Sequence, residues 1–153
     1  MKPGNVERAI KELLRNKNVQ SAEPLFGRFD LAVTGAFRDF EALQRFSEEL
    51  RSKDYCESCA THPTFDLWKR DERPERPWNA WTLVRAQNPQ NVKTKMRQIE
   101  AVSRIYATAG ENDLVVRLSA DSPEELHEAI LSQVQRVPGV RRTETLAAPR
   151  TEA

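Results

Sequence analysis

Two stretches of the sequence resemble each other along their whole length, and this internal repeat constrains the fold more than any other feature. The first stretch is GRFDLAVTGAFRDFEAL, which begins at Gly27, and the second is GENDLVVRLSADSPEEL, which begins at Gly110. The offset of 83 residues also holds for the pair Asp30 and Asp113 and for the leucines that end both stretches. A repeat of this kind predicts two copies of one folding unit, because both copies carry the same pattern of apolar positions.

Each copy is predicted to contain a helix, two strands joined by a tight turn, and a second helix. In copy two, Asn88 before Pro89 is typical of a helix start. Ser122-Pro123-Glu124-Glu125 is a capping box that begins the second helix. Between these helices, residues Ser103–Thr108 and Asp113–Leu118 alternate as half-buried strands do.

A last strand is predicted at the end of each copy, Tyr55–Thr61 in copy one and Val140–Ala147 in copy two. Copy two has a further strand in front, Ala80–Ala86. Residues 78–148 therefore follow the ferredoxin-like order β-α-β-β-α-β, an α+β fold with both helices on one face of a four-stranded antiparallel sheet. The other sheet face is left bare, and the obvious cover is the second copy, with the two sheets packed face to face.

Copy one lacks this leading strand, and two explanations compete. The first is that the start is misassigned and a strand lies upstream of Met1. Alternatively, the chain turns at His62-Pro63 and Phe65–Lys69 fills the vacant position beside the Tyr55–Thr61 strand, which makes copy one a circular permutant. The predicted organisation is copy one at 1–69, a charged linker RDERPERP at 70–77, copy two at 78–148 and a tail at 149–153.

The stretch from about Ala80 to Ala148 resembles the ligand-binding (RAM) module of the Lrp/AsnC family of transcription regulators. The features that carry the resemblance are EAVSRIYATAGENDLVVRLSADSPEELHEAI and, after it, PGVRRTETL. The family pattern is a strand ending in a glycine turn and an aspartate, a second strand, a capped helix, Pro-Gly-Val, and a strand with T-x-T, here Thr143-Glu144-Thr145. The turn at Gly110 is one residue longer than the turn in the family pattern. Copy one fits less closely, since Ser58-Cys59-Ala60 stands in place of T-x-T.

The resemblance implies a stand-alone module that binds a small effector and oligomerises, with itself or with a partner regulator. In that family small effectors, often amino acids, bind at module interfaces near the glycine turn and the last strand. Carried over, the turn offers backbone N–H groups to a carboxylate, Asp113 accepts an ammonium group, and the threonines offer hydroxyls. The implied ligand-binding residues are Thr108, Ala109, Gly110, Asp113, Thr143 and Thr145 in copy two, and Gly27, Asp30 and Ser58 in copy one. The alternative is structural: the glycines satisfy hairpin geometry and Asp113 hydrogen-bonds the turn backbone.

Neither a nucleic acid nor a membrane is an expected partner. Family regulators carry an N-terminal DNA-binding helical domain, and there is no room for one before Val6. The 24 basic and 23 acidic residues nearly cancel, whereas a nucleic-acid binder usually has a basic excess. The sequence has no membrane-spanning apolar run, and MKPGNVERAI has no signal-peptide core, so a cytoplasmic location is expected.

Catalysis, metal binding and a cofactor are not expected either. Cys56 and Cys59 lie in a predicted strand, where positions three apart point to opposite faces, so they do not suit a zinc site. Ferredoxin-like relatives include tetrapyrrole-processing enzymes, which need a general acid or base such as histidine. His62 and His127 lie outside the predicted sheet face, which disfavours this alternative. A third alternative is an assembly module that binds no ligand.

Overall fold

The computed structural model describes residues 4–70 and 74–149 of the chain, which divides into two compact units, residues 1–63 and 64–153. Residues 1–3, which adjoin the strand considered upstream of Met1, lie outside the described residues. So do residues 71–73 of the predicted linker and 150–153 of the predicted tail.

The first unit consists of a helix, a β-hairpin and a helix, in the order that the repeat predicts. Helix α1 (Asn5–Leu14) is followed by strands β1 (Val19–Pro24) and β2 (Leu31–Gly35) and by helix α2 (Phe40–Arg51). Strands β1 and β2 form an antiparallel two-stranded sheet. Asp39 is the N-cap of α2 and accepts a hydrogen bond from the backbone N of Ala42, as expected for a short polar residue at a helix start.

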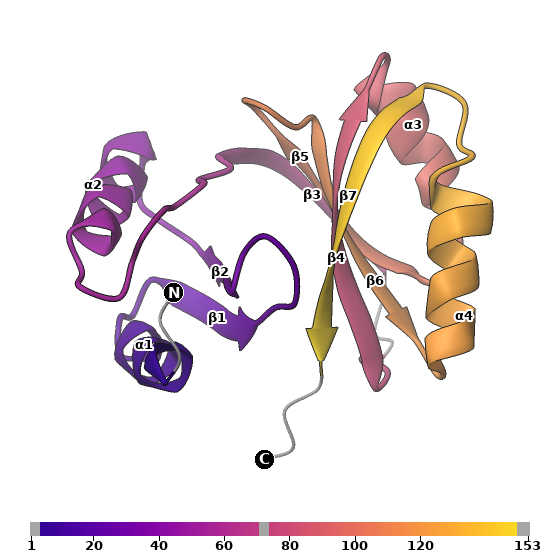
Figure 1. Cartoon of the computed structure of the whole chain (residues 1–153). Helices are drawn as coiled ribbons and strands as arrows, with labels where there is room; N and C mark the ends of the chain where they lie inside the picture. Colours follow the sequence, from indigo (N-terminus) through magenta and orange to yellow (C-terminus); the bar gives the residue numbers. More distant parts are fainter. Residues whose placement is uncertain (1–3, 71–73, 150–153) are drawn as a thin grey trace. The chain divides into compact units, whose positions relative to one another are not determined.

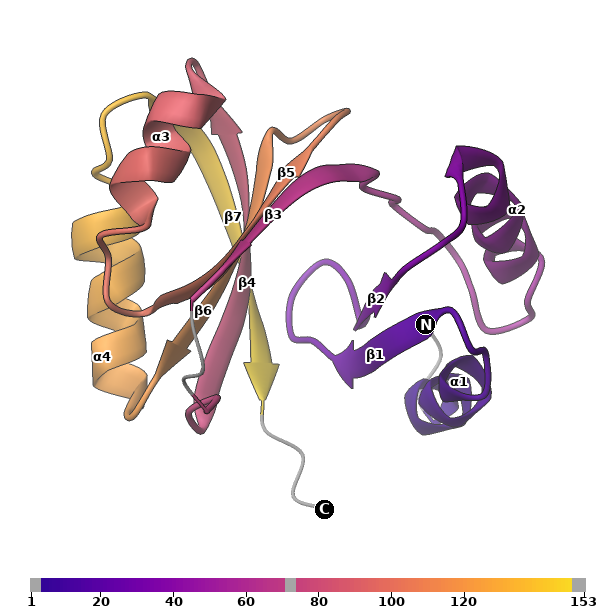
Figure 2. The same ribbon diagram turned by 180° about the vertical axis from the view of Figure 1, so that it is seen from behind.

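The second unit contains the complete β-α-β-β-α-β order, preceded by one extra strand. The elements are β3 (Thr64–Lys69), β4 (Trp78–Ala86), α3 (Pro89–Met96), β5 (Val102–Thr108), β6 (Leu114–Ala120), α4 (Pro123–Glu128), its continuation as a π-helix η1 (Ala129–Val134), and β7 (Val140–Pro149). Every neighbouring pair of strands is antiparallel in the order β3-β5-β6-β4-β7. Figures 1 and 2 show α3 and α4 on the same side of this sheet. The ferredoxin-like prediction for copy two is confirmed.

The core of the second unit lies between the sheet and these two helices. Alternate residues of the inner strands point into it, including Val84, Ile105, Leu114 and Val116, which are fully buried. Asn88 and Ser122 cap the two helices as predicted, since their side chains accept hydrogen bonds from the backbone N of Asn91 and Glu125. Asn88 begins α3 directly after the end of β4 that contacts the β5–β6 turn, whereas Ser122 begins α4 after the opposite end of the sheet.

The internal repeat extends to the details of the backbone. Both hairpins have the same cross-strand register at an offset of 83 residues; for example, Ala22 lies opposite Val33 and Ile105 opposite Val116. The register also shifts at the equivalent place in both, between Val19 and Ser21 and between Val102 and Arg104. Helix α2 corresponds residue for residue to α4 and η1 together. The first unit is thus the central α-β-β-α part of the module found in the second unit.

Two predictions for copy one are wrong. Residues Tyr55–Thr61 do not form a strand, and Phe65–Lys69 does not lie beside them. Instead, β3 joins the sheet of the second unit, antiparallel to the outer edge of β5. The circular-permutation hypothesis therefore fails. At the offset of 83 residues, Tyr55–Thr61 corresponds to residues 138–144, which include the first part of β7. Strand β7 pairs with β4, and no counterpart of β4 exists in the described part of the first unit.

Strand β3 is held in the second unit by a partly buried ion pair and by Arg70. The Lys93 ammonium, on α3, is almost fully buried and pairs with the carboxylate of Asp66. The Arg70 guanidinium donates to the carbonyl oxygens of Arg97, Ile99 and Val102 at 2.9–3.0 Å. These contacts fasten both ends of β3 to α3 and β5.

The Asp66–Lys93 pair predicts how stability depends on pH. The hydrogen bond from Lys93 lowers the pKa of Asp66 from 3.8. A depressed folded-state pKa adds stability that is present above the unfolded value and is lost as pH falls through the folded value. We therefore expect Asp66→Asn to be less stable than the parent protein at pH 7, and we expect this deficit to be smaller at an acidic pH below the unfolded value of about 3.9. Urea unfolding at both pH values checks this, with the exposed substitution Glu124→Gln as control. A deficit in Asp66→Asn that is equal at both pH values contradicts the prediction.

Candidate functional site

The β5–β6 turn, where the sequence places Gly110, is an exposed and well-braced loop at one end of the sheet. Gly110 has φ of +119°, in the left-handed region that favours glycine, and a β-carbon there would meet no atom within 4 Å. The turn is closed by a hydrogen bond from Thr108 N to Asp113 O, 3.0 Å long, and by one from Thr108 Oγ1 to Asn112 O, also 3.0 Å. Thr108 is buried, whereas Ala109 and Gly110 are exposed. The Thr108 hydroxyl thus braces the turn, and the exposed backbone lies at its tip.

Asp113 ties this turn to the neighbouring strand β4. Its backbone N donates to the carbonyl oxygen of Val84 at 2.9 Å, and its Oδ2 accepts from the backbone N of Ala86 at 2.8 Å. Ala86 is buried, so this amide is shielded from water. One carboxylate oxygen of Asp113 therefore has a structural role, in agreement with the alternative that this residue hydrogen-bonds the backbone.

Removal of the Asp113 carboxylate is expected to destabilise the second unit. Asp113→Ala leaves the Ala86 amide without its acceptor, and an unpaired buried donor costs about 1–3 kcal/mol. Asp113→Asn keeps an acceptor oxygen and is expected to cost much less. Chemical denaturation of the two variants measures the difference, and equal stability of both would contradict this structural role.

The two threonines of β7 lie on the opposite side of β4 from the turn. Thr143 is paired in register with Val84 and Thr145 with Thr82. Because strands are about 4.8 Å apart, Thr143 lies roughly 10 Å from Asp113 across β4. The Thr145 hydroxyl is 3.0 Å from that of Thr82. The structure thus brings the turn, Asp113 and Thr143 to one end of the sheet, while the Thr145 hydroxyl already has a protein partner.

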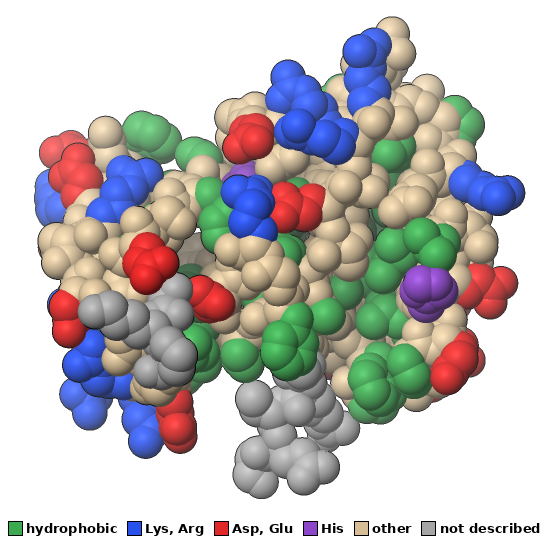
Figure 3. Space-filling view, in the orientation of Figure 1, with side chains coloured by type: hydrophobic (Ala, Val, Ile, Leu, Met, Phe, Trp, Pro, Cys, Tyr) green, Lys and Arg blue, Asp and Glu red, His purple; other side chains and the backbone are tan. Residues whose placement is uncertain are grey.

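Three arginines at this end of the sheet were not among the residues predicted for the site. Arg85, Arg141 and Arg142 are exposed, and Figure 3 shows Lys and Arg side chains gathered over the upper ends of β4 and β7. Arg85 donates to the carbonyl oxygen of Glu111, and Arg142 lies 3.6 Å from the Glu111 carboxylate. The sequence signal was the proximity of Arg141 and Arg142 to Thr143, but a pair of arginines in isolation is typical of a solvated surface.

The residues predicted in copy one are only partly brought together. Gly27 has φ of +132° and Asp30 O accepts a hydrogen bond of 2.9 Å from Leu25 N, which repeats the geometry of the Gly110 turn. Ser58 lies in an exposed non-strand segment, because the strand predicted to carry it is absent. The first unit therefore has the turn without the strand corresponding to β7.

Cys56 and Cys59 lie in the same non-strand segment as free, half-buried thiols. Burial raises the pKa of Cys56, with the nearby Cys59 as a smaller cause. A reactive thiol needs the opposite shift, so this environment does not activate Cys56. Within residues 4–70 and 74–149, no group of three His, Cys, Asp or Glu side chains is placed to hold a metal ion.

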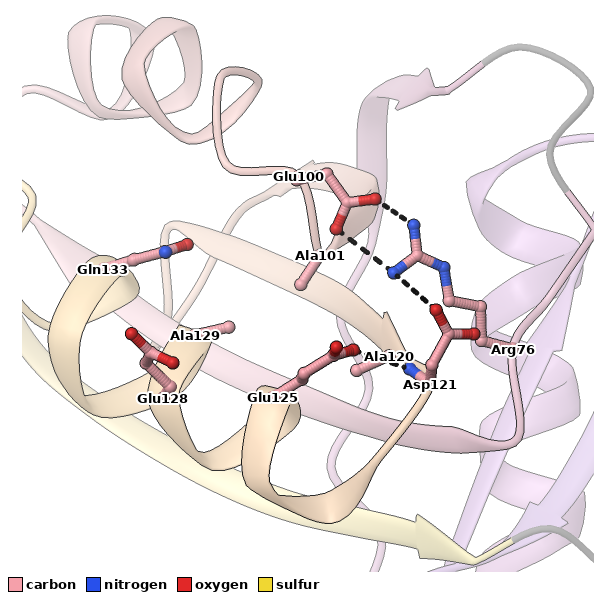
Figure 4. A pocket seen from close by; sticks show the side chains of 9 residues that line it. All are labelled: Arg76, Glu100, Ala101, Ala120, Asp121, Glu125, Glu128, Ala129 and Gln133. Carbon is pink, nitrogen blue, oxygen red and sulfur yellow. Dashed lines mark hydrogen bonds and ion pairs between the residues drawn. The ribbon is translucent and has the colours of Figure 1, made fainter.

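A shallow pocket of about 320 Å³ lies at the other end of the sheet, near the end of β6. Figure 4 shows the Arg76 guanidinium pointing to Glu100 and Asp121, both of which pair with it. Glu125 accepts a hydrogen bond from the backbone N of Asp121 at 3.2 Å. The acidic groups near Arg76 thus have partners within the protein, and the pocket does not include any residue of the predicted site.

Comparison with known protein families gives a match for most of the second unit. Residues 82–151 match the family model of the Lrp/AsnC ligand binding domain. This range contains the Gly110 turn, Asp113 and both threonines of β7. Most of the second unit is therefore similar to the ligand-binding domain of the Lrp/AsnC family.

The solved structures that resemble the chain include several regulators. FFRP-DM1 is 26% identical over 46% of this chain and 97% of its own, with a TM-score of 0.44. AsnC of E. coli is 13% identical over 74% of each chain, with a TM-score of 0.45. The feast or famine regulatory protein of M. tuberculosis, solved in complex with L-methionine, is 18% identical over 74% of each chain, with a TM-score of 0.43. A search of curated protein sequences found no significant match.

Among the described residues, no helix has the length and apolar character needed to cross a membrane.

Proposed function

We propose that the second unit binds a small effector, an amino acid, at the Gly110 turn and the first part of β7, and that the chain serves as a regulatory module that binds this effector and oligomerises. The observation that carries the proposal is the match to a ligand-binding domain over residues 82–151, which includes both segments. The role is binding rather than catalysis.

The chemistry of the turn suits a ligand that carries both charges. An amino acid needs donors for its carboxylate and an acceptor for its ammonium group, because burial of an unpaired charge is costly. The exposed turn backbone and the guanidinium groups of Arg85 and Arg142 are the donors. Arginine suits this role, since it can donate two parallel hydrogen bonds to a carboxylate. Asp113 is the acceptor: its Oδ2 is bonded to Ala86, so Oδ1 is the atom that faces the ammonium group in this proposal.

Thermal unfolding in the presence of each of the twenty amino acids tests the proposal. A ligand at 100 times its dissociation constant is expected to stabilise the protein by about 2.7 kcal/mol. If none of the twenty raises the melting temperature at millimolar concentration, the amino-acid proposal is wrong and an assembly role without a ligand is favoured.

The substitution Thr143→Val tests whether β7 takes part in binding. The variant keeps the shape of the side chain and removes the hydroxyl, and a lost hydrogen bond to the ligand is expected to cost about 1–3 kcal/mol of affinity. Calorimetry with the amino acid found in the first experiment measures this loss. Thr94→Val, on the exposed face of α3, is the control and should bind as the parent protein does. Thr145→Val is a less direct test, because it also removes the contact with Thr82. Unchanged affinity in Thr143→Val would remove this residue from the site.

A further inference from the structure

Three basic residues lie directly opposite one another on neighbouring strands of the five-stranded sheet. Lys69 of β3 is paired in register with Arg104 of β5, and Arg104 is paired in register with Arg117 of β6. Directly opposed residues have β-carbons about 4.5–5.5 Å apart, and like charges in such positions repel. We call Lys69, Arg104 and Arg117 the basic row.

The basic row lies on the sheet face opposite α3 and α4. The residues next to it in sequence point toward the helices: Trp68 packs against the core, and Ile105 and Val116 are part of it. Because side chains alternate between the faces of a strand, the basic row must point the other way. This is the face left bare by the helices of the second unit.

Arg117 has a counter-charge, but the other two members of the row do not. The Glu75 carboxylate lies 2.7 Å from the Arg117 guanidinium, which also lies 4.8 Å from the centre of the Trp81 ring. Within residues 4–70 and 74–149, neither Lys69 nor Arg104 has an acidic side chain within ion-pair distance. The polar side-chain contact of Arg104 is the Tyr106 hydroxyl, at 3.5 Å. Two adjacent positive charges thus remain uncompensated.

Apolar side chains lie beside this pair of charges. Leu67 is paired in register with Tyr106 in the neighbouring row, on the same face. Leu67 is 49% exposed. Two cations next to an accessible apolar surface match a ligand with a doubly negative head and an apolar body.

We propose that Lys69 and Arg104 bind the dianionic head group of a small ligand, a phosphate monoester or a dicarboxylate, whose apolar body packs on Leu67 and Tyr106. This site goes beyond the amino-acid site at the turn. Arg104 lies four residues before Thr108 along β5, which is about 13 Å at the usual rise of a strand. The two sites also differ in ligand, since the turn suits a zwitterion and the basic row suits a dianion.

Isothermal calorimetry on the full chain at low ionic strength tests the site with phenyl phosphate and with phthalate as probes. Binding of one probe and not the other assigns the head group, and both results support the site. Arg104→Gln and Lys69→Gln are each expected to weaken binding about tenfold or more, as the loss of one charged hydrogen bond does. Arg136→Gln and Lys17→Gln remove the same charges at exposed positions elsewhere and should leave binding unchanged. The proposal is overturned if neither probe binds, or if the two pairs of variants weaken binding equally.

The ligand-free protein gives a second, independent measurement. Because Lys69 and Arg104 repel each other, Arg104→Gln should raise the melting temperature of the unliganded protein, whereas Arg136→Gln should not. A lower melting temperature in Arg104→Gln would show that Arg104 stabilises the sheet itself, and it would contradict a position kept for a ligand. Inorganic phosphate bound as tightly as phenyl phosphate would contradict the role of the apolar body. None of these results bears on the amino-acid site, because the turn does not contain the substituted residues.

Discussion

Replacement of Leu114 by alanine is expected to destabilise the protein by about 2–5 kcal/mol, the range for removing a large aliphatic side chain from a packed core. Leu114 is fully buried and lies on β6, which has β5 on one side and β4 on the other. Its side chain points toward the helices as part of the core. The surroundings are held by two strands and two helices, so they cannot collapse far into the cavity that the substitution leaves.

The repeat supplies a matched control for this prediction, because Leu31 is the equivalent residue of the first unit. Leu31 is only half-buried, and β2 has β1 as its strand partner in the described part of the first unit. We expect Leu31→Ala to cost about 1 kcal/mol, since less apolar area is lost from a site that can relax. Urea unfolding followed by circular dichroism and by tryptophan fluorescence measures both. Equal losses of stability in the two variants would contradict the prediction, because they would mean that the difference in burial between Leu114 and Leu31 has no effect.

Gly139→Ala is expected to cost about 2–4 kcal/mol, because two effects add at this position. Gly139 has φ of +100°, which is unfavourable by about 1–2 kcal/mol for a residue with a β-carbon. That β-carbon would also lie 2.9 Å from Cγ2 of Val92, a fully buried and stiff β-branched side chain. Relief of such an overlap in a packed region typically costs about 1–3 kcal/mol more.

Gly110→Ala separates these two effects. Gly110 has φ of +119°, but a β-carbon there meets no atom within 4 Å. The backbone strain remains and the overlap is absent, so a loss of about 1–2 kcal/mol is expected. Thermal or chemical denaturation of both variants gives the comparison. A loss in Gly110→Ala as large as that in Gly139→Ala would mean that the contact with Val92 contributes nothing.

The sequence predicts which segments make up the candidate site, but it does not predict the hydrogen-bond partners of their side chains. The turn, Asp113 and the β7 threonines are set by local pattern and by strand order, and the structure puts the turn, Asp113 and Thr143 at one end of the sheet. That Asp113 Oδ2 bonds Ala86 and that Thr145 contacts Thr82 depends on which residues face each other across β4. The basic row also could not be predicted from the sequence. Its members are far apart along the chain and become neighbours only through the register of three strands.

The sequence by itself determined the repeat, the helix starts and the hairpins, because each is decided by residues a few positions apart. Asp39 and Ser122 cap helices in both copies, and Gly27 and Gly110 adopt positive φ in both turns. The pairing of the two sheet faces stays a prediction. Only the tertiary structure decided where Thr64–Lys69 pairs, since an alternating apolar strand fits the edge of any sheet equally well by local pattern. Strand β3 lies on β5, where Asp66 pairs with the buried ammonium group of Lys93 and Arg70 donates to three carbonyl oxygens.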